Sequence, residues 1–149
     1  MYHFAGIPEF YRMFQRFFDE GLAQASFLVG CDRTKQAAVI DPRRDASVYG
    51  AAAEQLAATI VAAIETHLHA DFVSGARELA ERGARVDASP GSDLQYTHLA
   101  VRDGEAIAVG DLTLTCLHTP GHTPAQHEGI PQLVDVVGGM AAYRALETT

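Results

Sequence analysis

The sequence predicts a single α/β domain, and three observations support this prediction. The 149 residues are 48% hydrophobic and 20% charged, which is enough apolar material for one buried core. Segments typical of strands and helices alternate in the middle of the chain, as they do where helices connect the strands of a parallel sheet. A histidine-rich motif, residues 65–71, directly follows one of the apolar strand segments.

The first 66 residues predict four strands and one helix. A turn at Gly21 separates the first two strands, and Asp41-Pro42 ends the third because proline cannot donate a ladder hydrogen bond. Residues 48–58 carry alanines and leucine at helical spacing, with Asp45 or Ser47 as the N-cap. The four strands are expected at residues 12–18, 26–29, 37–40 and 60–66.

The segment after the histidine motif predicts a second helix, a short strand and a hairpin. Ser74 is expected to cap a helix over residues 76–82, in which Glu78 and Arg82 form an ion pair one turn apart. Gly83 is expected to end this helix. The strands are expected at residues 85–88, 106–109 and 112–117, the last two joined by a turn at Gly110-Asp111.

The residues of the histidine motif suit a metal ion. In an extended backbone, alternate side chains lie on one side, so His67, His69 and Asp71 can converge where the strand opens into a loop. Imidazole and carboxylate are ligands for zinc or non-haem iron. Further ligands must come from elsewhere in the chain, and the segment from His118 to His122, which contains Pro120-Gly121, is a candidate source.

Composition and charge argue against several other functions. A net charge of −8 and a pI near 5.2 do not favour nucleic acid as a partner. No segment is apolar over a length that would span a membrane, and no export signal is evident at the N-terminus. Cys31 and Cys116 do not form a Cys-x-x-Cys motif, and two cysteines cannot provide a dense disulfide framework. A cytoplasmic location is the expectation.

Several spaced motifs resemble the metallo-β-lactamase superfamily, and more narrowly its persulfide dioxygenase branch, whose members are often fused to rhodanese domains. The resemblance covers about residues 10–124, where the sequence has the right motifs in the right order. These motifs are Phe17-Phe18-Asp19-Glu20, the segment 37–45 around Asp41-Pro42, the segment 65–79 around the histidines, and Thr119-Pro120-Gly121-His122-Thr123. The resemblance implies an αββα-type fold, of which this chain carries the N-terminal half.

The resemblance also implies a metal and a reaction. In the dioxygenases two histidines and one aspartate hold Fe(II), and a persulfide such as glutathione persulfide is oxidised to sulfite and a thiol. The two histidines match His67 and His122, whereas His69 and Asp71 match positions that bind metal in the two-metal hydrolases and, in the dioxygenases, mostly shape the pocket and its hydrogen bonds. Phe72 stands where two-metal hydrolases such as glyoxalase II keep a histidine, which favours iron and oxygen chemistry, although zinc stays possible.

The resemblance ends near residue 124, and this limits what the chain is expected to do. Residues 125–149 form a divergent tail with a faint rhodanese-like character, as if the chain were joined across a large deletion. The aspartate that supplies the third ligand in the relatives is then missing, and Asp135 is a poor replacement. The expected loss of the second half leaves an uncovered sheet face and open edges, which predicts self-association.

Ordinary structural roles compete with these assignments. A His-x-His pair can form plain hydrogen bonds, Cys116 fits a packed apolar position, and Cys31 fits a turn. The aromatic residues near the N-terminus can form core packing or a substrate pocket. Besides an iron-dependent persulfide dioxygenase, the alternatives are a non-catalytic remnant that acts through association and a glyoxalase II-like zinc hydrolase, which Phe72 disfavours.

Overall fold

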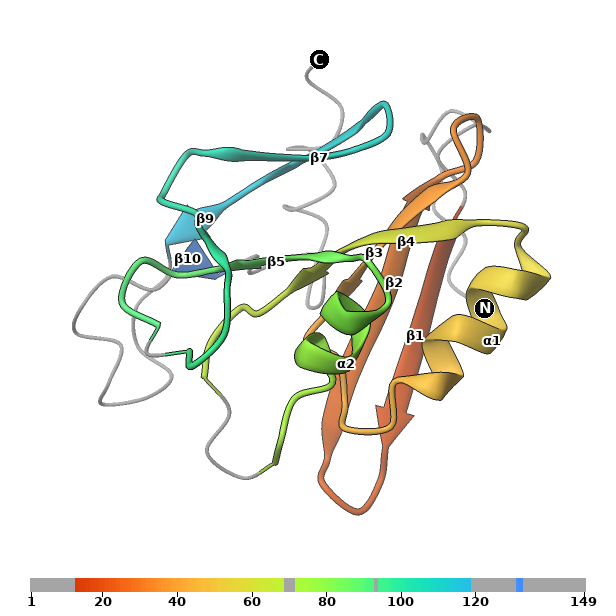
Figure 1. Ribbon diagram of the computed structural model, residues 1–149, viewed down its shortest axis with the longest axis horizontal. Coiled ribbons are helices and arrows are strands. Elements are labelled where there is room, and N and C mark those ends of the chain that lie inside the picture. The colour runs from red at the N-terminus through yellow and green to blue at the C-terminus, as the bar shows by residue number, and fades with distance from the viewer. Residues whose placement is uncertain (1–12, 69–71, 93, 119–130, 133–149) are drawn as a thin grey trace.

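The computed structural model describes residues 13–68, 72–92, 94–118 and 131–132. Its main feature is a twisted six-stranded sheet with the strand order β1-β2-β3-β4-β5-β6 (Figure 1). The pairs β1–β2 and β2–β3 are antiparallel, whereas β3 to β6 run parallel to one another. The strands are β1 (Met13–Asp19), β2 (Gln24–Cys31), β3 (Gln36–Ile40), β4 (Thr59–Ile64), β5 (Arg85–Ala88) and β6 (Leu99–Ala100).

Two short helices cover one face of the sheet. Helix α1 (Ser47–Gln55) connects β3 to β4, and α2 (Ala76–Glu81) connects β4 to β5, so both are crossover helices between parallel strands. Their buried residues pack on the sheet in one apolar cluster, with Tyr49 fully buried among them. Gly83, with φ of 102°, follows α2 in the left-handed conformation expected of a glycine stop signal.

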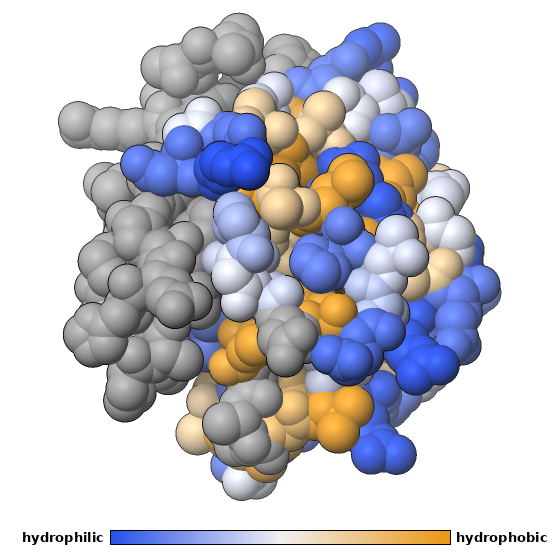
Figure 2. Space-filling model, turned by 60° about the vertical axis from the view of Figure 1, so that its left-hand side comes forward, coloured by the Kyte–Doolittle hydropathy of each residue, from blue (hydrophilic) through white to orange (hydrophobic). Residues whose placement is uncertain are grey.

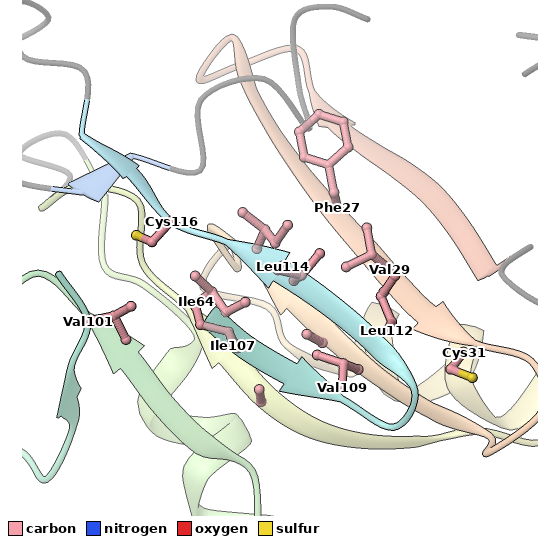
Figure 3. Close-up of a cluster of buried hydrophobic side chains, with 13 residues drawn as sticks. Phe27, Val29, Cys31, Ile64, Val101, Ile107, Val109, Leu112, Leu114 and Cys116 are labelled. Atoms are coloured by element: carbon pink, nitrogen blue, oxygen red, sulfur yellow. The ribbon is translucent and has the colours of Figure 1, made fainter. Parts of the chain in front are cut away.

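A hairpin covers the opposite face of the sheet. Its strands β7 (Ala106–Val109) and β8 (Leu112–Thr115) alternate buried and less buried residues, so that one side faces the sheet. Figure 3 shows this second apolar cluster, in which Ile107, Val109, Leu112 and Leu114 of the hairpin meet Val29 and Ile64 of the sheet. The expectation of an uncovered sheet face is therefore wrong for the part under this hairpin.

Most predicted elements are present, with differences at their ends. β2 is longer than predicted and includes Cys31, which is a fully buried strand residue and not the expected turn residue. The short strand β6 was not predicted, because two exposed residues offer no alternating pattern. After β8 the chain forms β9 (Leu117–His118), which pairs antiparallel with β10 (Pro131–Gln132), also not predicted. The α/β fold class is confirmed.

No helix in the part of the chain that the structure describes combines the length and the apolar character needed to cross a bilayer.

Candidate metal centre

His67 lies at the carboxyl end of the parallel strands, three residues after the end of β4. In open α/β sheets this edge is where ligands bind, because the loops that follow neighbouring strands meet there. The side chain of His67 is partly buried, and the neighbouring Leu68 is 43% exposed. The imidazole is thus held at the boundary between the core and the surface, as a metal ligand accessible to substrate must be.

Asp41, in the loop after β3, holds the backbone and side chain next to His67. One carboxylate oxygen, Oδ1, accepts a hydrogen bond from the backbone N–H of Thr66 at 2.8 Å. The other, Oδ2, accepts from the Thr66 hydroxyl at 2.6 Å. The same hydroxyl oxygen lies 2.9 Å from Nδ1 of His67. A chain of short hydrogen bonds therefore runs from the buried carboxylate to the imidazole.

The position of Asp41 is itself fixed by buried hydrogen bonds. Its N–H donates to the carbonyl of Ile64 at 2.8 Å, and its own carbonyl accepts from the side-chain amide of Gln24 at 2.8 Å. Its φ of 49° is unusual for a residue other than glycine, although aspartate tolerates the left-handed region better than most. This conformation lets one residue bind the backbone of β4 and point its carboxylate at the loop that carries His67.

The phenol of Tyr49 connects helix α1 to the same loop. Its oxygen lies 2.6 Å from the hydroxyl of Ser26 on β2 and accepts a hydrogen bond from the backbone N–H of Arg43 at 2.8 Å. The ring packs edge-on against Phe17 of β1, with the ring centroids 4.9 Å apart. Burial raises the pKa of Tyr49, so the phenol keeps its proton as a donor. This contact fixes the backbone two residues beyond Asp41.

The segment that returns to helix α2 is held against the same loop. The N–H of Gly75 donates to the carbonyl of Pro42 at 3.0 Å. A side chain at Gly75 would overlap the backbone oxygen of Arg43, so this close approach requires glycine. The Ser74 hydroxyl bonds the buried carboxylate of Glu65 and accepts from the N–H of Ala76 at 3.0 Å. The predicted capping role of Ser74 is wrong, because Gly75 is the N-cap of α2 and the helix has no side-chain capping hydrogen bond.

Tyr96, in the loop between β5 and β6, contributes a second phenol on this side of the core. Burial and the charge of the Glu65 carboxylate raise its pKa to about 12. The phenol is therefore fully protonated near neutral pH and can act as a hydrogen-bond donor.

The direction of β8 brings the second histidine segment toward the same edge. The turn between β7 and β8 lies at the opposite edge, because Asp111 pairs with Arg33 and contacts Cys31. From there β8 runs in the direction of β3 and β4, and Cys116 packs in the same cluster as Ile64, the last residue of β4 (Figure 3). In Figure 1, β9 accordingly lies at the side of the molecule where β4 and β5 end. The topology thus brings the backbone of Leu117 and His118 to the carboxyl edge of the sheet.

Of the four predicted metal ligands, His67 is the one whose surroundings the structure describes. His69, Asp71 and His122 lie outside the described residues, and so does the tail except residues 131–132. Within the described ranges, no group of three histidine, cysteine or acidic side chains is placed to hold a metal ion. The assignment of His67, His122, His69 and Asp71 as ligands therefore stays a prediction.

The structure also places residues whose role the sequence left open. Cys116 is buried in the apolar cluster, and burial raises its pKa to about 12, so it is a packed and unreactive thiol as expected. Phe14 stacks near Phe27 with a centroid distance of 5.7 Å, and Phe17 packs on Tyr49. For these two aromatic residues the core role is confirmed. Sequence reasoning missed Gln24 and Tyr49, since neither lies in a recognisable motif.

The chain belongs to the metallo-beta-lactamase superfamily, whose family model matches residues 19–129. The matched span includes strands β2 to β6, both helices, the hairpin and both histidine segments, whereas β1 lies before it except for Asp19. The N-terminal half of a metallo-β-lactamase sandwich, expected from the sequence, is thereby confirmed as the fold.

Two curated relatives show which enzymes the chain resembles. A probable hydroxyacylglutathione hydrolase of Schizosaccharomyces pombe is 31% identical over 101 residues, covering 66% of this chain and 40% of the relative. The human mitochondrial persulfide dioxygenase ETHE1 is 31% identical over 106 residues, with the same coverage of 66% and 40%. The chain thus spans about two fifths of the length of these relatives, and they do not distinguish the two activities.

Two solved structures have the same fold over most of this chain. A metallo-beta-lactamase from Staphylococcus aureus has a TM-score of 0.71 at 42% identity, covering 78% of this chain and 36% of that one. ETHE1 from Myxococcus xanthus has a TM-score of 0.70 at 31% identity, covering 78% and 51%.

The described part of the centre is compatible with a metal ion, as the name of the superfamily leads one to expect. His67 supplies an imidazole whose Nδ1 is already engaged by Thr66, which is the arrangement that metal-bound histidines have in proteins. The buried carboxylate of Asp41 accepts the proton of that hydroxyl and so holds it in place beside the imidazole.

Proposed function

We propose that this chain carries the metal-binding half of an iron-dependent persulfide dioxygenase, an enzyme that oxidises glutathione persulfide or a related persulfide to sulfite and a thiol. The observation that supports this reading most is Phe72, at the position where two-metal hydrolases keep a histidine. An apolar ring there leaves ligands for one metal. The similarity to ETHE1, in sequence and in fold, agrees with this choice.

In this proposal the residues of the chain hold the metal ion and position the substrate beside it. A bound ferrous ion would supply sites at which the persulfide sulfur and dioxygen bind side by side. His67, with His122 and one further donor among His69 and Asp71, would hold it at the carboxyl edge. Leu68 and Val73, which are 43% and 64% exposed, flank the site with apolar surface suited to a sulfur substrate.

The experiment is to express the protein, purify it without oxygen and measure its iron content and its oxygen uptake with glutathione persulfide. The proposal expects close to one iron per chain and uptake that produces sulfite. His67→Ala and His122→Ala are each expected to lose both iron and uptake. His98→Ala is the matched control, because it removes a partly buried imidazole that bonds locally to the carbonyl of Tyr96 and should change neither.

A zinc hydrolase of the hydroxyacylglutathione hydrolase type is the second candidate, favoured by the relative from Schizosaccharomyces pombe at the same identity. The hydrolase and the dioxygenase can be distinguished by the metal that the protein binds and by the effect of a substitution at position 72. A hydrolase of this type would bind zinc and cleave a hydroxyacylglutathione thioester without consuming oxygen. Phe72→His restores the missing histidine and is expected to increase zinc binding. Thioester cleavage by the unmodified protein, without oxygen uptake, would overturn the dioxygenase proposal.

A chain without either activity would act through association, and the sheet edges favour a second copy as the partner. Within the described residues, β1 and β6 each pair with one strand, and they carry the exposed Phe18 and Leu99. Figure 2, which brings the left-hand side of Figure 1 forward, shows small apolar patches separated by hydrophilic residues on that face. Light scattering is expected to show a dimer or larger species that Phe18→Lys or Leu99→Lys dissociates. Leu22→Lys, in an exposed turn, is the control.

A further inference from the structure

The hydrogen bonds around Thr66 have only one consistent arrangement of protons. A carboxylate accepts hydrogen bonds and cannot donate them, so the Thr66 hydroxyl must direct its single proton to Oδ2 of Asp41, 2.6 Å away. The lone pairs of that oxygen then face Nδ1 of His67 at 2.9 Å. Two facing lone pairs would repel each other, and therefore Nδ1 must carry a proton and donate it.

We infer that Asp41 and Thr66 act as a relay that fixes the neutral imidazole of His67 in the tautomer with the proton on Nδ1 and the lone pair on Nε2. Asp41 and Thr66 are thus positioning residues: they decide which ring nitrogen can bind a metal ion. The inference requires no particular metal or substrate, because it concerns the protons of the metal-free chain.

The rigidity of the surroundings makes this relay a property of the fold. Asp41 cannot turn its carboxylate away, since its Oδ1 also accepts the Thr66 N–H and its backbone is bound on both sides by Ile64 and Gln24. Asp41 and Thr66 are 7% and 6% exposed, so water has little access to compete for their hydrogen bonds. The tautomer is selected by the loop after β3 before any ligand arrives.

A substitution that hardly changes the shape of the site should reverse the direction of the hydrogen bonds in the relay. In Asp41→Asn the side-chain carbonyl can still accept the Thr66 N–H, but the amide nitrogen takes the place of Oδ2 and donates. The Thr66 hydroxyl must then accept from the amide, and it turns its own proton toward Nδ1 of His67. The imidazole becomes the opposite tautomer, with the proton on Nε2, while the shape of the site is nearly unchanged.

The test is long-range ¹H–¹⁵N correlation spectroscopy of the metal-free, ¹⁵N-labelled full chain at a pH above 8, where imidazoles are neutral. The His67 signals are assigned by their loss in His67→Gln. We expect the Nδ1-protonated pattern in the unmodified chain, the Nε2-protonated pattern in Asp41→Asn, and a loss of the fixed tautomer in Thr66→Val. Thr66→Ser keeps the hydroxyl and should restore the original pattern.

Controls separate the relay from general damage to the fold. Ser74→Ala removes another hydroxyl from the same edge, one that contacts Glu65, and should leave the His67 tautomer unchanged. Cobalt(II) binding followed by absorbance should weaken about 10- to 100-fold in Asp41→Asn. An Nε2-protonated His67 in the unmodified chain overturns the inference even if every variant unfolds, and so does an unchanged tautomer in a folded Asp41→Asn. Absent dioxygenase activity with an Nδ1-protonated His67 would refute the proposed function alone.

Discussion

The carboxyl edge and the amino edge of the parallel sheet are stabilised by different kinds of interaction. At the carboxyl edge, buried hydrogen bonds join the loops after β3 and β4, with Asp41 and Thr66 at their centre. At the amino edge, ion pairs between partly exposed side chains fasten the turns, as in Arg33–Asp111 and Lys35–Asp32. Exposed ion pairs are screened by water and contribute little, whereas a buried polar group without its partner is costly. Local order is therefore concentrated at the edge that carries His67.

The largest effect is expected from Asp41→Ala. The change removes two hydrogen bonds to a buried carboxylate, leaves the Thr66 N–H without its acceptor and puts alanine at a φ of 49°. We expect the free energy of unfolding to fall by about 3 kcal/mol. Chemical denaturation followed by circular dichroism measures it. The matched control is Asp111→Ala at the amino edge, and equal losses in the two variants would refute the contrast between the edges.

Tyr49→Phe tests how far the polar network at the carboxyl edge reaches. The variant keeps the ring against Phe17 but leaves the Ser26 hydroxyl and the Arg43 N–H without the phenol oxygen. A loss of about 2 kcal/mol is expected, because both groups are left in or near the core. Thermal denaturation gives the comparison with Tyr96→Phe, for which a smaller loss is expected since Tyr96 is only partly buried.

Gly75→Ala probes the close contact between the two loops. The φ of Gly75 is −80°, which alanine adopts easily, so any loss comes from the overlap of the new methyl group with the oxygen of Arg43. About 1–3 kcal/mol is expected for this overpacking. Gly104→Ala separates the two effects in the opposite way, because Gly104 has a φ of 78° and no atom of the described residues lies within 4 Å of the new methyl group. Its free energy of unfolding should fall by roughly 1 kcal/mol from backbone strain alone. Addition of salt should alter neither loss.

The smallest effect is expected from Arg33→Ala at the amino edge. The Arg33 side chain is 66% exposed, and its partner Asp111 is 38% exposed. The free energy of unfolding should change by less than about 0.5 kcal/mol, and this small difference should shrink further in high salt. Denaturation at low and high ionic strength measures both. A loss above 2 kcal/mol would mean that the amino edge is as tightly coupled as the site.

The sequence was sufficient to predict the elements whose signals are local. The apolar run before the histidines became β4, Gly83 ended α2, and Glu78 pairs with Arg82 at 2.7 Å. It also placed His67 at a strand end. The contacts that hold His67 could not be predicted from the sequence. Gln24 reaches Asp41 from another strand, and Tyr49 binds the N–H of Arg43 with a phenol that belongs to no motif.

The coverage of the sheet could not be predicted for a similar reason. Loss of a domain's second half suggests a bare face, but the alternation in residues 106–115 does not tell which surface the hairpin packs on. The salt bridge from Asp111 to Arg33, and the apolar side chains along β7 and β8, settle that in three dimensions.

The left-handed backbone of Asp41 has a consequence for how this site can change over time. The Thr66 amide and hydroxyl occupy both carboxylate oxygens of Asp41 and so help to hold that conformation, and among the described residues Thr66 bonds to no other carboxylate. Positions 41 and 66 should therefore be epistatic, because a replacement that is accepted at one position depends on the residue at the other. A single substitution at either position is expected to be selected against more strongly than a matched double substitution.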